Sequence, residues 1–393
     1  MKKKWLWGIV IVLVLVLATA GVTVGDTAEP ETKSLSLAQA IEIAMKDNLQ
    51  VELAALGLEQ AELTLEQAEF AKKKMINILP NPERKDQNMA LVIDVVPVQA
   101  QSGKVIAEVG KAYTENSIKF GVEAAYYGVL RAEKMLEVSR ASLLRAQEQL
   151  KQAEAKFKAG TVAKFEVISA EAQLKSAEAA VNEAEAGVKK ALMALNQTLN
   201  LNLDTPIKLT DKFSFSQAGD IDTEKVFQDM TEKDLSYVSA KEKYNINEVN
   251  FNYHQKYYTK NTFKYREAEY AFKESEVNLD NAKTQLQLNI KNAYLDLKTA
   301  ENNYQVLTKS VEQAKEAYRL TKLRYDVGMA TGYDLLGVET SLKQADLGLL
   351  NALYNYNLAK AKFTYGVFGS LSADSNGAQM PQGAASDGMP SGM

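Results

Sequence analysis

The sequence predicts a mostly α-helical (all-α) fold, built from long antiparallel coiled-coil helices in two tandem structural repeats. Three observations lead to this prediction: only 7 prolines among 393 residues, apolar residues at heptad spacing, and an internal repeat that aligns without a gap. Proline lacks an amide donor and clashes with the preceding helical turn, so its scarcity permits long uninterrupted helices. Heptad spacing is typical of helices that pack along a narrow seam.

The N-terminus has the pattern of a secretory signal peptide, expected over residues 1–25. Lysines at positions 2–4 precede an apolar run from Trp5 to Leu17, and the small residues Ala18-Thr19-Ala20 provide a cleavage site. An uncleaved membrane anchor is the alternative interpretation. No second run approaches the ~20 apolar residues of a spanning helix. We therefore expect the mature chain to be exported.

An internal repeat sets the expected domain organisation. The segment KFKAGTVAKFEVISAEAQLKSAEA aligns without a gap with RYDVGMATGYDLLGVETSLKQADL, at an offset of 168 residues. Paired positions include Gly160 with Gly328, Tyr126 with Tyr294, and Glu171 with Glu339. The expected units are a first helical repeat at 34–201, an inter-repeat linker at 202–221, a second helical repeat at 222–369, and a disordered tail at 370–393.

Large and small residues alternate at the two seam positions of each repeat. In the first repeat the large residues recur every seventh position, at Leu136, Leu143, Leu150 and Phe157. Small residues follow three positions later, at Ser139, Ala146 and Ala153. This alternation lets neighbouring helices approach closely. Because 168 residues is a whole number of heptads, the second repeat keeps the same phase. A plain rod would have the same seam, so heptads alone do not identify the function.

Glycines mark the expected helix–helix turns. Gly160 and Gly328 fit the left-handed position at which many helices end. Neither glycine nor proline occurs between Gly219 and Gly328, so we expect helix nearly throughout that stretch. A helix of about 50 residues would be ~75 Å long.

The paired turns KFKAGTVAKFEV and RYDVGMATGYDL resemble those of the TolC-like outer-membrane efflux proteins, as does the upstream segment LSLAQAIEIAMKDNLQVELAALGLEQAELTLEQAE. The resemblance covers Ser34 to Gly369. It implies an efflux or export conduit of the cell envelope, at the outer membrane or in the periplasm. The family resemblance further implies a homotrimer with a hollow helical cylinder. Its tip would meet a periplasmic adaptor protein and an inner-membrane pump.

The same resemblance implies roles for three residues at the tip. Tyr325 matches a tyrosine that helps to hold the tip closed, and Asp334 matches an aspartate that lines the entrance. Glu166 is the repeat mate of Asp334, and we expect it within hydrogen-bonding reach of Tyr325. A ring of carboxylates would favour cations. Alternatively, the two acidic residues only stabilise the helix N-termini through the helix dipole. Ala330 and Gly337 depart from the family, which has charged residues there.

The two turns are also the expected adaptor-docking sites. Gly160 and Thr161 form the centre of the first turn, and Gly328 and Met329 form the centre of the second. The shared heptad phase predicts that the two turns lie side by side at one end of the molecule.

The opposite end departs from the family, whose members place four barrel strands per subunit there. Met89–Ala100 supplies one candidate strand, although Pro97 is unfavourable in it. Phe251–Phe272 shows no alternating strands but is rich in aromatic residues. We therefore expect little or no β-barrel. The aromatic residues suit either a membrane–water interface or the core of a compact helical cap.

Other function classes lack support in the sequence. His254 is the only histidine, and there is no phosphate-binding glycine loop, metal signature or nucleophile elbow. We therefore predict that the chain is not an enzyme and has no cofactor. A net charge of −4 gives no indication of nucleic-acid binding. The alternative function is a barrel-less, envelope-spanning structural or adaptor-like coiled-coil protein, which oligomeric state and pore shape would distinguish from a conduit.

Overall fold

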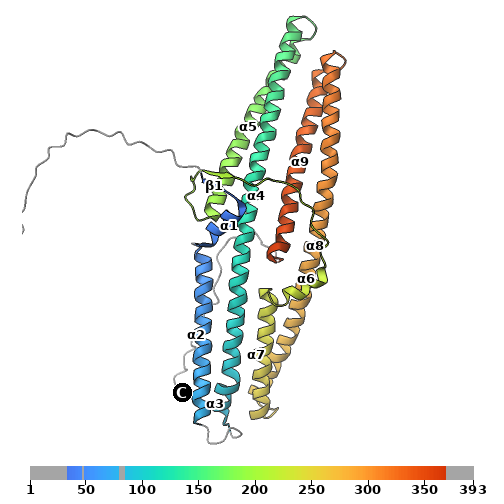
Figure 1. The fold of residues 1–393 in the computed structure, drawn as a ribbon. Coiled ribbons are helices and arrows are strands. Elements are labelled where there is room, and N and C mark those ends of the chain that lie inside the picture. Colours follow the sequence, from blue (N-terminus) through green and yellow to red (C-terminus); the bar gives the residue numbers. More distant parts are fainter. Residues whose placement is uncertain (1–32, 47, 79–84, 369–393) are drawn as a thin grey trace, which may run out of the picture.

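The computed structural model describes residues 33–46, 48–78 and 85–368, which form an elongated bundle of long helices (Figure 1). The predicted signal peptide and the predicted disordered tail lie outside the described residues. In chain order the elements are β1 (Lys33–Leu35), α1 (Leu37–Lys46), α2 (Leu49–Asn77), α3 (Gln87–Ala90), the π-helix η1 (Leu91–Val95), α4 (Val96–Lys158), α5 (Lys164–Thr198), β2 (Ile207–Leu209), α6 (Thr223–Met230), α7 (Leu235–Tyr257), α8 (Phe263–Asp326) and α9 (Gly332–Tyr365).

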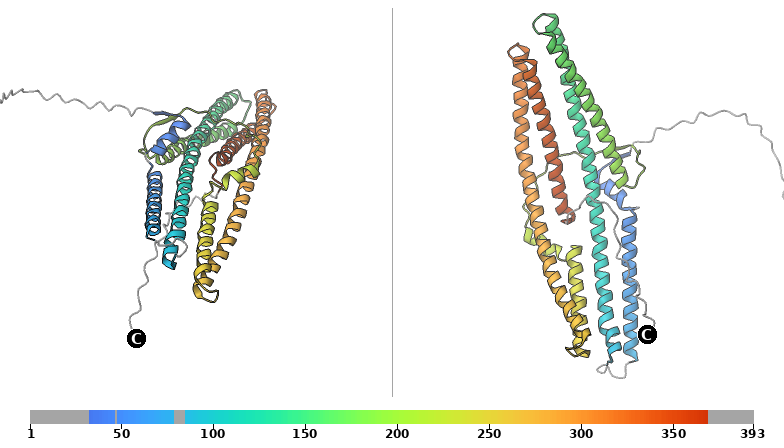
Figure 2. Two further views of the ribbon diagram at one scale, coloured as in Figure 1. Left: turned by 60° about the horizontal axis from the view of Figure 1, so that its bottom comes forward. Right: turned by 180° about the vertical axis from the view of Figure 1, so that it is seen from behind.

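Two helices, α4 and α8, run almost the full length of the molecule. They contain 63 and 64 residues, which corresponds to ~95 Å each. Helix α5 returns beside α4 and α9 returns beside α8 from two turns at the same end, which we call the tip (Figures 1 and 2). Helices α2 and α7 lie beside α4 and α8 toward the opposite end, which we call the base.

Strand is confined, within the described residues, to β1 and β2, which pair in parallel with Leu35 opposite Leu209. The prediction of a mostly helical chain with little strand is confirmed. The sequence predicted no second segment of spanning length, but within the same residues the helical stretch Gln87–Lys158 is long and apolar enough to span a membrane. The core helix of a soluble protein passes the same test.

The candidate strand at Met89–Ala100 is helical instead, with α3, η1 and the start of α4. The Asp86 carboxylate caps the helix start by accepting a hydrogen bond from the Met89 amide at 2.8 Å. The π-helical turn η1 then leads into α4, where Pro97 lies in the first turn. Proline is tolerated there next to the π-helical turn, where the regular α-helical hydrogen-bond pattern is interrupted.

The prediction of helix nearly throughout the stretch between Gly219 and Gly328 is confirmed, although two short breaks divide it into α6, α7 and α8. Side-chain caps start the new helices without any glycine. The Asp234 carboxylate accepts from the Tyr237 amide at 2.8 Å, and the Thr262 hydroxyl accepts from the Tyr265 amide at 3.4 Å. Such caps satisfy amides that a helix start leaves free, so the chain can turn there.

A buried tyrosine fixes the middle of the molecule. The Tyr126 hydroxyl, on α4, lies 3.0 Å from the carbonyl oxygen of Leu35 and 2.8 Å from the Asp211 carboxylate. Burial raises the pKa of Tyr126 to about 12, and the bond to Asp211 adds to the shift. Val122 and Leu195 pack in the same core. The contact ties α4 to β1 and to the segment between the two halves.

At the base, η1 contacts α7, so Leu91–Val98 and Phe251–Phe272 lie together. The rings of Phe251 and Phe272 stack with centroids 5.5 Å apart, which joins α7 to α8. The Tyr253 hydroxyl donates to the Gln87 carbonyl oxygen at 3.0 Å. Several of the aromatic residues therefore form the core of a helical cap.

Candidate functional site at the tip

Both turns at the tip have the same backbone structure. Gly160 has φ of 72° and Gly328 has φ of 78°. The Thr161 amide donates to the Lys156 carbonyl oxygen at 3.0 Å, and the Met329 amide makes the equivalent bond at 2.7 Å. This is the Schellman arrangement, whose left-handed residue is usually glycine. The two repeats therefore reach the tip through equivalent turns.

The helices that follow the turns start differently. At the start of α9 the Asp334 carboxylate accepts from the Thr331 amide at 2.9 Å and from the Thr331 hydroxyl at 2.8 Å. The Asp334 amide donates back to that hydroxyl, which completes a capping box. The backbone bond from Thr331, and then the hydroxyl bond, lower the pKa of Asp334. Helix α5 begins after Ala163, which has no side-chain oxygen to cap it.

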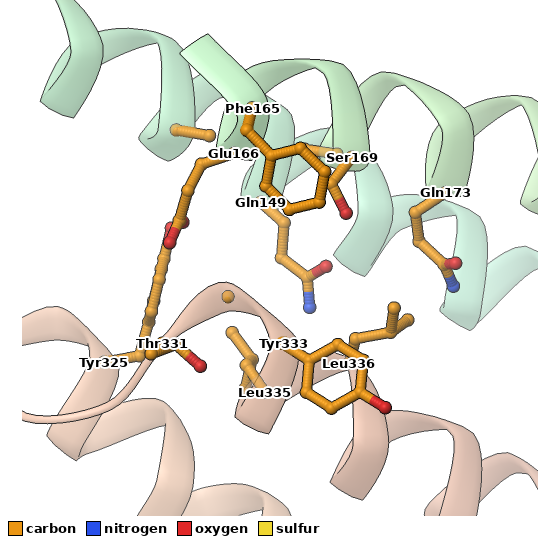
Figure 3. Close-up of a pocket in the computed structure, with 13 residues that line it drawn as sticks. Gln149, Phe165, Glu166, Ser169, Gln173, Tyr325, Thr331, Tyr333, Leu335 and Leu336 are labelled. Carbon is orange, nitrogen blue, oxygen red and sulfur yellow. The ribbon is translucent and has the colours of Figure 1, made fainter. Parts of the chain in front are cut away.

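Glu166, the repeat mate of Asp334, reaches across to the other hairpin instead. Its Oε2 atom lies 2.9 Å from the position that a Cβ on Gly332 would occupy, so any larger residue there would displace it. Figure 3 shows its carboxylate beside the ring of Tyr325. Burial, and secondly the charge of Glu166, raise the pKa of Tyr325. Among the described residues, however, no hydrogen bond joins the two side chains.

Glu166 and Tyr325 line a cavity of 310 Å³ between the two hairpins (Figure 3). Phe165 and Tyr333, which also line it, are 76% and 83% exposed. Leu335, on α9, forms part of the buried wall. The cavity is therefore an opening between the two hairpins whose walls are largely apolar and whose charge comes from Glu166.

A lysine links the hairpins behind this cavity. The Nζ atom of Lys156, on α4, lies 3.5 Å from the ring centroid of Tyr325, on α8. It also donates a hydrogen bond to the Tyr325 carbonyl oxygen at 2.7 Å. Tyr325 is only 3% exposed. A cation over an aromatic face is attractive, so Lys156 holds the two turns together.

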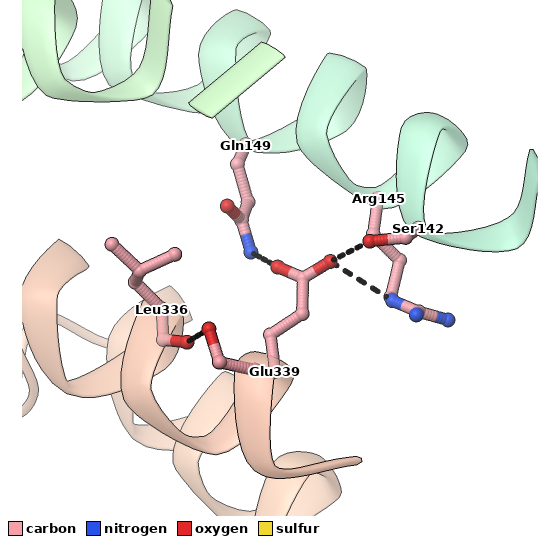
Figure 4. Close-up of polar contacts among 6 residues, drawn as sticks. Ser142, Arg145, Gln149, Leu336 and Glu339 are labelled. Atoms are coloured by element: carbon pink, nitrogen blue, oxygen red, sulfur yellow. Dashed lines mark hydrogen bonds and ion pairs between the residues drawn. The ribbon is translucent and has the colours of Figure 1, made fainter. Parts of the chain in front are cut away.

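A buried carboxylate makes the strongest polar link between the hairpins (Figure 4). Glu339, on α9, is 1% exposed. Its two oxygens accept from Arg145 Nε at 3.1 Å and from Gln149 Nε2 at 2.6 Å, both on α4. The Ser142 hydroxyl lies 3.4 Å from the same carboxylate. Because a buried charge is costly without partners, this cluster fixes how α9 lies against α4.

Lys156, Arg145, Gly332 and Glu339 are site residues that the sequence pattern does not single out. The repeat pairing of Glu171 with Glu339 is no signal of burial, because glutamate is common at the positions that flank an apolar heptad seam. Heptad spacing alone does not show which copy is buried. That depends on which helix faces the other hairpin.

Comparison with known proteins identifies the family. The sequence pattern of the family described as Outer membrane efflux protein matches residues 105–201 and 240–364. The chain belongs to this family. Each matched segment contains one of the two glycine turns, so the match covers both halves of the helical bundle.

Solved structures share the fold. The CmeC outer membrane channel of Campylobacter jejuni is 17% identical, with 84% of this chain and 85% of that chain covered and a TM-score of 0.63. The outer membrane protein VceC of Vibrio cholerae is 17% identical over 84% and 96% of the two chains, with a TM-score of 0.63. The MtrE outer membrane channel of Neisseria gonorrhoeae is 18% identical over 87% and 91%, with a TM-score of 0.56. A sequence search of curated proteins finds no match.

The family assignment confirms several predictions from the sequence. The resemblance to TolC-like efflux proteins is correct, and the chain is an outer membrane efflux family member of the cell envelope, not an enzyme. The alternative of a purely structural or adaptor-like coiled coil is not favoured.

Proposed function

We propose that the chain is one subunit of a homotrimeric efflux conduit that docks with a periplasmic adaptor and an inner-membrane pump. The observation that carries the proposal is the pair of equivalent turns at one end of a long helical shaft, with a cavity between them. In this proposal, 34–201 and 222–369 are the two repeats of each subunit, and 202–221 joins them.

Closure of the tip is assigned to weak contacts between the hairpins. Lys156 with Tyr325, and Glu166 with the surface at Gly332, both cross from one hairpin to the other. A cation–π contact contributes about 0.5–1 kcal/mol at an exposed site and about 2 kcal/mol where the groups are desolvated. Both contacts lie closer to the turns than the buried Glu339 cluster, so the ends of the hairpins can separate while that cluster keeps α9 on α4. Three copies of the exposed Asp334 would add negative charge at the entrance and favour cations.

Docking is assigned to the glycine turns, Gly160-Thr161 and Gly328-Met329. Exposed apolar side chains at the second turn support this assignment, since Val327 and Met329 are each 71% exposed. Exposed apolar groups at the end of a soluble shaft suit a contact with another protein.

The first test is the oligomeric state with pore shape. The purified chain should be a trimer by light scattering, with a hollow centre in electron microscopy. A monomer, or a solid dimer, would contradict the conduit proposal.

The second test is ion leakage through reconstituted trimers. Tyr325→Leu removes the ring under Lys156 and should increase leakage more than Tyr325→Phe, which keeps the ring. Glu166→Gln removes the charge that reaches Gly332 and should also increase leakage, whereas Asp334→Asn should mainly weaken cation preference. Equal leakage in all variants and in the unmodified chain would contradict the proposal that these contacts keep the tip closed.

The third test concerns docking and uses the absence of cysteine from the sequence. Thr161→Cys and Met329→Cys each introduce a single thiol at a turn, and a matched Glu137→Cys places one on the shaft of α4. Thiol crosslinking to a purified adaptor should occur at the turns only. Crosslinking at Glu137→Cys alone would contradict docking at the tip.

A further inference from the structure

Each repeat carries an exposed aromatic ring in the first turn of the helix that follows its glycine turn. Phe165, on α5, and Tyr333, on α9, are repeat mates separated by the offset of 168 residues. They are 76% and 83% exposed. An aromatic side chain at a helix start provides no cap and has only a modest helix propensity. Neither helix stability nor core packing therefore explains why both positions are aromatic.

The two rings line the same cavity at the tip. Figure 3 shows Phe165 and Tyr333 on opposite sides of the gap between the hairpins, so each hairpin supplies one ring. Leu335 and Leu336 add apolar surface from α9. The volume of 310 Å³ is at the lower end of the range for small-molecule sites, about 300–1,000 Å³. The cavity is therefore large enough for a compact organic molecule.

The cavity wall carries one negative charge. The Glu166 carboxylate is partly buried in it, while Gln149 and Gln173 add neutral amides that point toward the gap (Figure 3). Among the described residues that line the cavity, none is basic. Lys156, behind the cavity, is held by the ring and the carbonyl oxygen of Tyr325. A carboxylate among apolar groups has lost part of its hydration, so a cation beside it is stabilised.

We infer that the tip cavity binds a small organic cation with an aromatic or bulky aliphatic body. The faces of Phe165 and Tyr333 attract a cation that lies within about 6 Å of the ring centroid. Glu166 supplies the opposite charge, and the leucines pack against the apolar body of the ligand. A hydrated metal ion would find a single carboxylate and apolar walls, which is too few oxygen ligands. An anion would be repelled by Glu166.

The inference goes beyond the proposed conduit function and does not rest on it, because one subunit supplies both walls of the cavity. It also differs from the role proposed for Asp334, which the cavity wall, as described, does not include. A ligand in this position contacts α5 and α9 at once. Its binding therefore favours the arrangement in which the two hairpins lie together.

The test is isothermal titration calorimetry of the full purified chain with benzyltrimethylammonium, which combines a quaternary cation with one aromatic ring. This probe should bind saturably. Tetramethylammonium, which lacks the ring, and benzenesulfonate, which carries the opposite charge, should each bind at least about tenfold more weakly.

Two changes in the cavity separate the contributions of charge and rings. Glu166→Gln keeps the shape of the side chain and removes its charge, so it should weaken binding of benzyltrimethylammonium at least about tenfold. Phe165→Leu with Tyr333→Leu keeps apolar side chains and removes the aromatic faces, and it should weaken binding about tenfold.

Matched controls remove the same groups outside the cavity. Glu154→Gln removes an exposed carboxylate of α4 near the tip. Phe263→Leu removes a ring that is 82% exposed at the base. Both variants should bind the probe as the unmodified chain does, and circular dichroism of every variant should show intact helices.

The inference would be overturned by the absence of saturable binding to the unmodified chain. Undiminished binding by Glu166→Gln, or by the double leucine variant, would also overturn it. Equal weakening by Glu154→Gln and Glu166→Gln would show a general effect of charge at the tip, with no specific site. Binding of the probe by a chain that proves monomeric would contradict the conduit proposal alone and leave the cation site in place.

Discussion

The first turns of α5 and α9 occupy equivalent positions in the two repeats, yet their acidic residues make different contacts. Asp334 is held by Thr331 in a capping box at its own helix start. Glu166 has Ala163 at the capping position, and its carboxylate extends to Gly332 on the other hairpin. The two helix starts differ at the capping position, threonine or alanine, and in the length of the acidic side chain, and only Asp334 is held at its own helix start.

The same comparison applies deeper in the bundle. Glu339 is buried against Arg145, whereas its repeat mate Glu171 is exposed. The residue equivalent to Arg145 in the second repeat is Gln313, which is also exposed and uncharged. The repeats thus keep their turns and their seam alike, and they diverge where one hairpin meets the other.

The largest effect on stability should come from replacing Glu339, the buried residue of the repeat pair Glu171 and Glu339. Glu339→Ala leaves Arg145 without its partner in a mostly buried site, which costs about 3–5 kcal/mol for a buried pair. Glu171→Ala, the matched control on the exposed mate, should change stability by less than ~0.5 kcal/mol. Urea unfolding followed by circular dichroism measures both. Similar losses in the two variants would show that the repeats do not differ here.

The next effect concerns the turns, where the repeats should behave alike. Gly160→Ala and Gly328→Ala each place a side chain in the left-handed region and should cost about 1–2 kcal/mol. Gly187→Ala is the control, because Gly187 lies within α5 with open space at its Cβ position. It should stabilise the helix by up to ~1 kcal/mol. Thermal melts would contradict the assignment if all three variants shifted in the same direction.

A smaller effect should follow from exchanging the caps. Thr331→Ala removes the capping hydroxyl and should cost about 1 kcal/mol. Ala163→Thr should add a cap to α5 and draw the Glu166 carboxylate back to its own helix start. The thermal midpoint should then rise slightly, and the pKa of Tyr325 should fall because a nearby charge is removed. An unchanged tyrosine titration in Ala163→Thr would show that Glu166 stays in place.

The smallest effect is a pH dependence at the capping box. The folded state lowers the pKa of Asp334 below its usual value of 3.8, so its carboxylate form favours folding. That contribution is complete above the unfolded pKa and is lost as the pH falls through the lower, folded pKa. The stability difference between the chain and Asp334→Asn should therefore shrink below about pH 4. A constant difference from pH 6 to pH 2 would contradict this.

Much of the fold could be predicted from the sequence, because the heptads and the repeat are local patterns. The glycine turns could also be predicted from the sequence, because few other residues adopt the left-handed backbone angles of a helix end. The exact position of the break between α7 and α8 does not follow from the sequence, because Thr262 caps a helix without glycine or proline nearby. The candidate strand at Met89–Ala100 is helical instead, because tertiary packing overrides the strand preference of its β-branched residues.

The candidate site was less predictable, because its contacts join residues far apart in the sequence. Lys156 and Tyr325 meet only after two hairpins are packed together. Arg145 and Glu339 are each unremarkable on a helix surface, and only the packing of α9 on α4 shows that they are buried together.

The contacts of Tyr126 anchor the middle of α4, and the helix beyond this point is long enough to amplify a small tilt. From Tyr126 to the end of α4 at Lys158 is ~48 Å of unbroken helix. A tilt of about 2° at Tyr126 would move the far end by about 2 Å, if the helix stays straight. Glu166 lies 2.9 Å from the place of a Gly332 Cβ, so a displacement of that size would change this contact between the hairpins. A small tilt in the middle of the molecule is therefore amplified along α4 into a change at the tip.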